Sequence, residues 1–395
     1  MCEDTYNLLG LSPMIRVPVL SKEGLPLMPT KASRARRWLL EGKAKVVHND
    51  LGLFQIQLTV EASGNATQDA VIGIDPGKLF TGIAVQAEHE TLSMFHLELP
   101  FKTVTERMST RSMMRRTRRS RRINRKVKFK SRNHREKRFN NRIAKKLPPS
   151  IKANKELEQR VIKELLAIYP VSHFIYEIVK ARGNRGFSPV QVGQLQQIEW
   201  LSSQLPTIIQ EGWKTSNLRQ YLGLPKNKED KSKQEPSTHA TDAISLACSH
   251  FIQYKQNHLE HSADWAGNVT VTNAQFAVVK RPPYSRRQLH LLQFSKGGKR
   301  RAYGGSTTIN GFRKGDLIMY KSKKETIIGY CSGSTGNLLS ISDFNWKRIT
   351  RAAVNHCSLV AKCTGLLIKV TLGNIISDSS HRQVLRTMSG VPSEV

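Results

Sequence analysis

The chain has 395 residues, of which 63 are lysine or arginine and 30 are aspartate or glutamate, so its formal net charge is +33. A charge of this size indicates a polyanionic partner, foremost a nucleic acid. The sequence shows no long apolar run and no secretory signal pattern, so we expect a cytoplasmic protein without a membrane partner. The five cysteines are scattered and form no CxxC pair, which supports neither a zinc ribbon nor a disulfide framework.

The first 60 residues alternate strand-like and helical runs. We expect strands at 15–20, 45–47 and 54–58, and a helix at 31–41 that Thr30 caps. One face of this helix is basic and includes Arg34 and Arg37. Those side chains either contact phosphates, as the overall charge favours, or form an ordinary solvated face.

An apolar run at 71–74 ends in Asp75, and Pro76-Gly77 turns the chain into a second β-prone run at 81–85. This pattern predicts a hairpin, and 91–99 predicts a third strand. Three consecutive strands, the first carrying an acid, are the beginning of a ribonuclease-H-like sheet. Taken alone, Asp75 has two uses: it caps the turn, which is the commoner one, or it binds a divalent cation with other ligands.

Residues 102–146 have the most unusual composition of the chain. They hold 13 arginines and seven lysines against two glutamates, a net charge of +18. No glycine or proline interrupts 102–147, so we expect a helix across this stretch. Its expected phosphate contacts are Arg111, Arg115, Arg116, Arg118, Arg119, Arg121, Arg122 and Arg125. The planar arginine fork suits phosphate oxygens, and the alternative is a disordered basic tail.

The next 120 residues bring further acids to the ends of predicted elements. We expect a helix at 151–168, a strand at 171–179, a helix at 191–210, a mobile charged loop at 226–236 and a helix at 238–256. Glu177 lies in the second half of the strand. His239 and Asp242 are three positions apart at the start of the last helix, so both project from one face.

From residue 268 the sequence becomes a series of short β-prone runs with glycine-rich turns. We expect strands at 269–272, 275–280, 289–294, 316–321, 325–331, 338–341 and 366–372, which together predict a small barrel or sandwich. The expected nucleic-acid contacts in this region are Arg286, Arg287, Lys299, Arg300 and Arg301.

Four side chains are the candidate catalytic set: Asp75, Glu177, His239 and Asp242. Three carboxylates on rigid elements are what two-metal phosphodiester hydrolysis requires, so we expect Asp75, Glu177 and Asp242 to bind two Mg²⁺ ions, with Mn²⁺ as a substitute. Because histidine exchanges protons near neutral pH, His239 is the candidate proton acceptor. Taken singly, each acid has a structural explanation: a turn cap for Asp75, a charge on an edge strand for Glu177 and a charge at a helix start for Asp242. Taken together, and with a polyanionic partner, they favour catalysis.

Several motifs in order resemble the transposon-encoded IscB and IsrB proteins. The segment PLMPTKASRARRWLLEGKAKVV resembles their N-terminal PLMP module, and IGIDPG, IYE and HATDA resemble the three RuvC motifs. The arginine stretch resembles the bridge helix, and RRQLH, KGGKRRAYGG and GFRKGD resemble the module that contacts the motif beside the DNA target. The resemblance implies an α/β chain with five parts: a PLMP module (1–70), RuvC part I (71–100), a bridge helix (101–147), RuvC parts II and III (148–265) and a β-barrel-like basic domain (266–395).

One departure selects a branch within that resemblance. Residues 178–238 contain no histidine, so an HNH nuclease site cannot lie there, and the chain resembles IsrB. This implies a prokaryotic monomer in a ribonucleoprotein, in which a guide RNA pairs with one strand of double-stranded DNA and RuvC nicks the displaced strand. The alternatives are a guide-free RuvC-like junction resolvase and a non-catalytic RNA-binding accessory protein.

Overall fold

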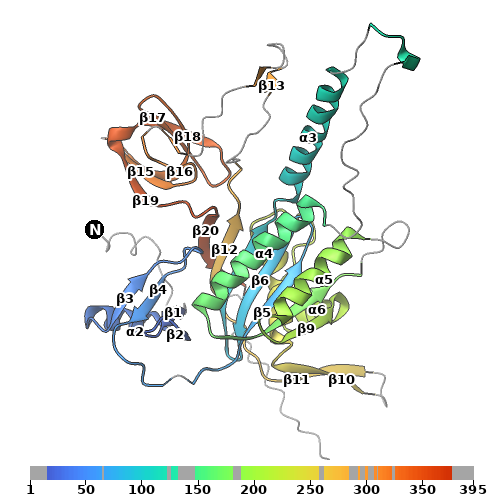
Figure 1. The fold of residues 1–395 in the computed structure, drawn as a ribbon. Coiled ribbons are helices and arrows are strands. Elements are labelled where there is room, and N and C mark those ends of the chain that lie inside the picture. Colours follow the sequence, from blue (N-terminus) through green and yellow to red (C-terminus); the bar gives the residue numbers. More distant parts are fainter. Residues whose placement is uncertain are drawn as a thin grey trace, which may run out of the picture. The chain divides into compact units, whose positions relative to one another are not determined.

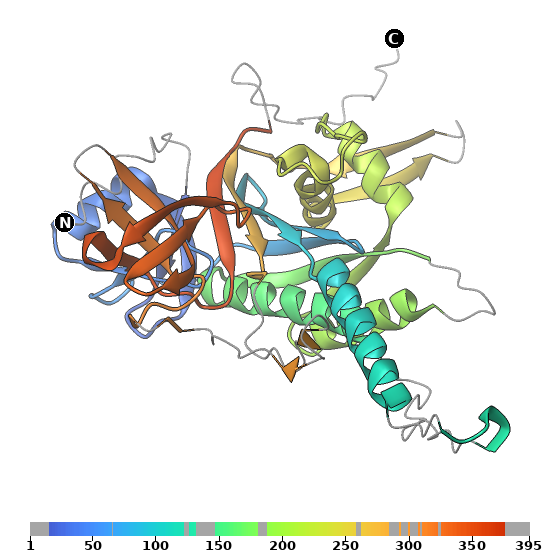
Figure 2. The same ribbon diagram turned by 90° about the horizontal axis from the view of Figure 1, so that it is seen from above.

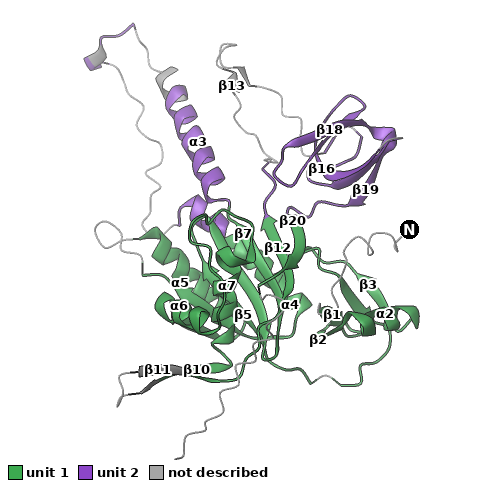
Figure 3. Cartoon of the chain, turned by 180° about the vertical axis from the view of Figure 1, so that it is seen from behind, with its two compact units in different colours: residues 1–99, 155–279, 368–395 green, residues 100–154, 280–367 purple. Residues whose placement is uncertain are grey.

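A computed structural model describes residues 16–64, 66–121, 126–131, 147–180, 188–257, 262–283, 292–293, 299–300, 307–308, 310–322 and 325–375. The chain divides into two compact units (Figure 3). One unit comprises residues 1–99, 155–279 and 368–395, and the other comprises residues 100–154 and 280–367. Within the described ranges, no helix combines the length and the apolar character that crossing a bilayer requires.

The N-terminal part of the first unit is a small sheet covered by one helix. Its elements are β1 (Arg16–Leu20), β2 (Pro26–Lys31), α2 (Ala32–Leu40), β3 (Ala44–Val47) and β4 (Gln55–Leu58), with strand order β2-β1-β4-β3. The core is formed by Val17, Val19, Ala35 and Ile56. Strand β2 was not predicted, and Thr30 belongs to it. The helix begins one residue later, with Lys31 as its N-cap and no side-chain cap, so the prediction that Thr30 caps the helix is wrong.

A seven-stranded sheet forms the centre of the same unit (Figure 1). Its strands are β5 (Ala70–Pro76), β6 (Phe80–Ala87), β7 (Glu90–Glu98), β8 (Val171–Ile178), β9 (Thr207–Glu211), β12 (Ala274–Lys280) and β20 (Leu367–Gly373), in the order β20-β12-β7-β6-β5-β8-β9. β5, β6 and β7 pair antiparallel, which confirms the predicted hairpin and third strand. β8 pairs parallel to β5, and β9 pairs parallel to β8. β12 and β20 were expected in the C-terminal β-rich region but pair here instead.

Helices cover both faces of this sheet (Figures 1 and 2). They are α4 (Pro149–Ile168), α5 (Pro189–Ser202), α6 (Gly212–Tyr221) and α7 (Pro236–Cys248). Thr81 bonds to a side chain of α4, whereas the next residue, Gly82, lies against the backbone of α7. Because successive residues of a strand face opposite sides, α4 and α7 lie on opposite faces of β6.

Two helices end earlier than the sequence predicts. The helix expected at 191–210 ends at Ser202, and β9 occupies the remainder. The helix expected at 238–256 ends at Cys248, and the hairpin of β10 (Ile252–Asn257) and β11 (Ser262–Gly267) follows. Pro206 explains the first error, because a proline interrupts the helical hydrogen bonds. In the second case, β10 is fixed by its partner strand rather than by local sequence.

The second unit contains the arginine-rich helix α3 (Phe101–Arg121), a turn of 3₁₀ helix (Phe129–Ser131) and a five-stranded antiparallel sheet. The strands of the sheet are β15 (Leu317–Lys321), β16 (Thr326–Thr335), β17 (Leu338–Ser342), β18 (Arg348–Ala353) and β19 (Cys357–Ala361), in the order β18-β17-β16-β15-β19; a 3₁₀ turn (Val354–His356) precedes β19. A two-stranded pair joins β13 (Leu292–Gln293) to β14 (Lys299–Arg300). Ile318, Cys331, Leu339 and Ile341 form the core of the larger sheet.

Three further differences from prediction concern this unit and the segment before β12. Residues 126–131 form a turn and a 3₁₀ helix, so the helix expected across 102–147 is not continuous. Strands β18 and β19 were not predicted, because neither follows a clear apolar alternation. The run at 269–272 was predicted as a strand but forms no strand, although the amide of Thr270 bonds to the carbonyl of Glu88.

Candidate active site

The structure brings the four predicted side chains to one end of β5 and β8. Asp75 is the penultimate residue of β5, and Glu177 is the penultimate residue of β8. The two strands are parallel with Ile74 opposite Tyr176, so both carboxylates lie at the carboxyl ends of neighbouring strands. His239 and Asp242 come from the first turns of α7. Nδ1 of His239 lies 3.6 Å from Oδ2 of Asp75.

Two glycines allow α7 to lie directly on the sheet. A Cβ added to Gly82 would lie 2.2 Å from the carbonyl oxygen of His239, and a Cβ added to Gly73 would lie 1.9 Å from that of Ala243. Real Cβ atoms do not approach backbone oxygens so closely. The helix backbone therefore fills the space of the missing side chains, and this contact fixes how far His239 stands from Asp75.

Glu177 is a half-buried carboxyl group beside two other acids, Asp75 and Asp242. Burial raises its pKa to about 7, and the charges of Asp75 and Asp242 act in the same direction. A hydrogen bond with Thr215 and the charge of Lys226 oppose the shift. Near neutral pH this side chain therefore exchanges its proton readily, and a positive charge placed among the three acids would hold it ionised.

Two basic side chains already contact the third acid. Nη1 of Arg219 lies 2.7 Å from Oδ1 of Asp242, and the ammonium of Lys226 bonds to Oδ2. Lys226 also donates to the carbonyl of Thr238 at 2.5 Å. Sequence reasoning missed both cations. Lys226 belongs to the loop expected to be mobile. Arg219 lies buried in α6, whose mostly polar sequence gives no signal that this arginine faces inward.

His239 is held by contacts on both sides of its ring. Its Nε2 lies 3.2 Å from the carbonyl oxygen of Lys231, and its ring centroid is 5.5 Å from Phe80 and 5.2 Å from His96. His96 was not predicted as part of the site. Burial lowers the pKa of His96 to about 3, with a smaller contribution from His239, so this second imidazole stays neutral.

A buried ion pair lies beneath the site on the α4 face of the sheet. Nζ of Lys155 lies 2.8 Å from Oε2 of Glu158, and the hydroxyl of Thr81 donates to Oε1 of Glu158 at 2.9 Å. Lys155 also donates to the phenol oxygen of Tyr176 at 3.3 Å. Burial, followed by the charges of Glu158 and Asp75, raises the pKa of Tyr176, so this phenol remains protonated.

Two features of the three acids favour the binding of a divalent cation, and one feature opposes it. Asp75, Glu177 and Asp242 offer carboxylate oxygens, which are the ligands that Mg²⁺ and Mn²⁺ prefer. Burial and the neighbouring acids raise the pKa of Glu177, and a bound cation would oppose this shift by favouring the ionised carboxylate. Asp242, however, shares each of its oxygens with Arg219 or Lys226, so it fits as a ligand through its remaining lone pairs or after Lys226 moves away.

The predicted nucleic-acid contacts fall into three groups. Arg34, Arg37, Arg111, Arg115 and Arg116 are exposed on α2 and α3. Arg118, Arg119 and Arg121 belong to α3, and Lys299 and Arg300 belong to β14, but the structure does not describe their side chains. Arg122, Arg125, Arg286, Arg287 and Arg301 lie outside the described residues. The described arginines present positive charge to solvent, as phosphate binding requires.

Comparison with known proteins gives one family match. Residues 17–185 match the model of a family described as RRXRR protein. The pattern of that name is present at 115–119, which reads Arg-Arg-Thr-Arg-Arg and lies in α3. No curated protein matches the chain. This match covers less than half of the chain, and its family is one of arginine-rich, IscB-like proteins.

Proposed function

We propose that this chain is a guide-RNA-directed DNA endonuclease of the IsrB kind, with a RuvC-type site that nicks the displaced DNA strand. The observation that carries the proposal is the convergence of Asp75, Glu177 and Asp242 at one end of the central strands. The strand order β7-β6-β5-β8-β9, with β8 and β9 parallel to β5, supports the proposal of a ribonuclease-H-like core. In the proposal, 71–100 and 148–265 form this core around the inserted bridge helix.

The side chains divide the reaction between them. Two bound Mg²⁺ or Mn²⁺ ions would supply an activated water and stabilise the leaving oxygen. Asp75 and Glu177 would hold the ions from fixed strands, and Asp242 would complete the ligand set from α7. Because a carbonyl oxygen only accepts, Nε2 of His239 carries the proton that it shares with Lys231. Nδ1 of neutral His239 then keeps its lone pair on the side of Asp75, where it can take the proton of the attacking water.

The charge of the chain supports a large polyanionic partner. Exposed arginines along α3 suit the phosphates of an RNA or of an RNA–DNA heteroduplex. Base pairing then selects the target, so the protein needs many phosphate contacts and few base contacts. Residues 178–238 lack the histidine base of an HNH site, so the proposed product is a nick.

The decisive experiment reconstitutes the purified chain with its co-purifying RNA, a matched double-stranded DNA target and Mg²⁺. We expect one nick in the displaced strand, and Asp75→Ala should reduce the nicking rate by roughly 10³-fold or more while RNA binding is retained. Cleavage of DNA junctions without RNA would instead identify a guide-free resolvase. A clean double-strand break would contradict a single nuclease site.

A second candidate function is RNA binding without catalysis. The double ion pair of Asp242 with Arg219 and Lys226 favours it, because a carboxylate neutralised by two cations is a weak metal ligand. The same reconstitution separates the two functions. Persistent failure of the wild-type complex to nick in Mg²⁺ or Mn²⁺, with RNA bound, would favour the accessory role.

The contribution of α3 is tested through salt dependence. Replacing Arg111, Arg115 and Arg116 together by alanine should weaken RNA binding. The slope of log K against log salt concentration should become shallower by about 0.7 to 0.9 for each phosphate that is no longer neutralised. Lys22→Ala is the matched control, because this ammonium pairs with Glu61 at 3.1 Å on the surface. An unchanged slope in the triple variant would remove α3 from the RNA interface.

A further inference from the structure

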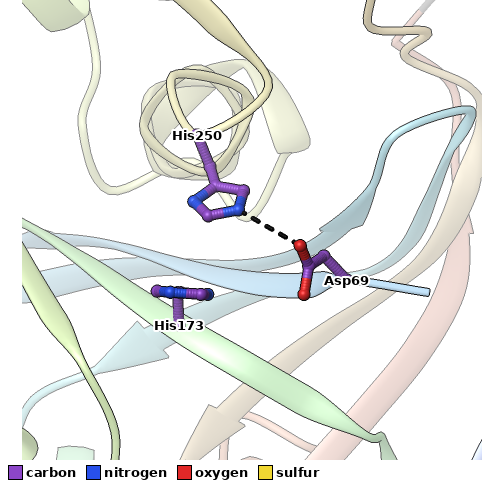
Figure 4. A group of neighbouring side chains, drawn as sticks. All are labelled: Asp69, His173 and His250. Carbon is purple, nitrogen blue, oxygen red and sulfur yellow. Dashed lines mark ion pairs between the residues drawn. The ribbon is translucent and has the colours of Figure 1, made fainter. Parts of the chain in front are cut away.

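A second cluster of side chains lies at the other end of the three elements that carry the candidate active site. Asp69 directly precedes β5, His173 is the third residue of β8, and His250 follows the end of α7. Figure 4 shows the three side chains gathered around one space, each from a different element. Asp69 and Asp75 are six residues apart on an extended strand, a separation of roughly 20 Å, so the two clusters are distinct.

The geometry of the cluster is that of a ligand set. Oδ2 of Asp69 lies 3.5 Å from Nε2 of His250, and the ring centroids of His173 and His250 are 4.5 Å apart. One potential ligand atom from each residue lies within 4.8 Å of the other two. A metal ion with bonds of about 2 Å fits between atoms at such separations after small side-chain rotations.

Ser172 sets the orientation of one imidazole. Its hydroxyl donates to the carbonyl oxygen of Ala70 at 3.3 Å, and its oxygen lies 3.0 Å from Nδ1 of His173. The same hydroxyl also hydrogen-bonds to the carboxylate of Asp69. With its one proton directed to the carbonyl or to the carboxylate, Nδ1 of His173 is the donor in the contact with the hydroxyl oxygen. The lone pair of neutral His173 is then on Nε2, the other ring nitrogen. Metal-ligating histidines are commonly fixed in this way, by a hydrogen bond to the ring nitrogen that does not bind the metal.

We propose that Asp69, His173 and His250 form a zinc site. Two imidazole nitrogens and one carboxylate oxygen are a donor set that suits Zn²⁺, with water in the fourth position, whereas Mg²⁺ prefers oxygen ligands alone. The side chain of Asp69 is 55% exposed, which leaves solvent access for that water. A bound ion would join the starts of β5 and β8 to the end of α7. The site is independent of the proposed nuclease function.

Zinc binding is measured on the full-length chain by competition with a chromogenic chelator and by metal analysis after gel filtration. We expect one Zn²⁺ per wild-type chain and its loss in His173→Gln and in His250→Gln. His89→Gln is the matched control, because this exposed imidazole has an acidic neighbour, Glu88, at 3.7 Å but no third ligand among the described residues. Asp75→Ala should keep its zinc, which separates this site from the candidate active site.

A second readout keeps the proposal testable if the histidine variants do not fold. Ser172→Ala leaves all three ligands in place and should weaken zinc binding about tenfold. Bound Co²⁺ should give the visible absorption of a four-coordinate ion in the wild type. Absence of stoichiometric zinc in the wild type would reduce the cluster to an ion pair with a neighbouring imidazole. Equal zinc content in wild type and in folded His250→Gln would place the metal elsewhere and overturn the proposal.

Discussion

β5, β8 and α7 carry a cluster of side chains at each end. The carboxylate end holds Asp75, Glu177 and Asp242, and the imidazole end holds Asp69, His173 and His250. At the carboxylate end, Asp75 and Glu177 stand close enough for mutual repulsion, and two cations contact Asp242. At the imidazole end, His173 and His250 offer ring nitrogens, which carry no negative charge, beside one acid, Asp69. Three shared elements alone therefore do not define the kind of site. The donor atoms decide which ion fits: carboxylate oxygens favour Mg²⁺, and imidazole nitrogens favour Zn²⁺. They also decide how strongly the ligands repel one another before an ion binds.

A substitution at the contact between α7 and β5 should disturb both clusters together. Gly73→Ala places a methyl group 1.9 Å from the carbonyl oxygen of Ala243, so α7 must shift away from β5. We expect a loss of about 3 kcal/mol or more in the free energy of unfolding, measured by denaturant titration, together with weaker zinc binding. Gly64→Ala is the matched control, because a Cβ there meets nothing within 4 Å. Wild-type stability in Gly73→Ala would show that α7 is not held by this contact.

An intermediate effect is expected from removing one cation at the carboxylate end. Lys226→Met leaves Asp242 with Arg219 alone, so the metal-free chain should lose about 2 kcal/mol of stability. Because the competing charge is gone, added Mn²⁺ should stabilise this variant more than the wild type. Thermal unfolding with and without Mn²⁺ measures both quantities, while zinc affinity should not change. Equal Mn²⁺ stabilisation of both proteins would mean that Lys226 does not compete for the site.

A smaller effect, confined to the carboxylate end, is expected in the pH dependence of stability. Because the pKa of Glu177 is raised to about 7, the folded chain keeps a proton that the unfolded chain loses above pH 4.5, so this residue makes stability fall as pH rises between these values. Glu177→Gln removes that dependence. Without divalent ions, we expect the variant to be more stable than the wild type by on the order of 2 kcal/mol above about pH 7, and equal to it near pH 4.

Denaturant titrations across this pH range measure the difference. Saturating Mg²⁺ should reverse it, since the ion favours the ionised wild-type side chain. A variant no more stable than the wild type at about pH 8 would contradict the burial of Glu177 among like charges.

Local patterns were sufficient for the strands that carry the site. The apolar run before Asp75, the Pro-Gly turn and the alternation in 91–99 predicted β5, β6 and β7, and residue type and order selected Glu177, His239 and Asp242. Each of these signals is local in the sequence. They also placed the acids at element ends, where parallel strands bring side chains together.

The features that could not be predicted from the sequence depend on contacts between residues that are distant in the chain. β9 was read as helix because Thr207–Glu211 has no alternation of its own and is fixed by pairing with β8. Arg219 and Lys226 looked like surface charges, and only the fold brings them to Asp242. His96 sits in a strand predicted for its apolar residues, with nothing local to mark it as a neighbour of His239.

The close contact between α7 and the sheet has an evolutionary consequence. Gly73 and Gly82 leave no room for even one methyl group, so neither position can change unless the helix moves. The helix cannot move without displacing His239 and Asp242 at its start and His250 beyond its end. The two clusters therefore share one steric constraint. Relatives that enlarge either glycine are expected to have altered both clusters together, because the same helix positions side chains in each.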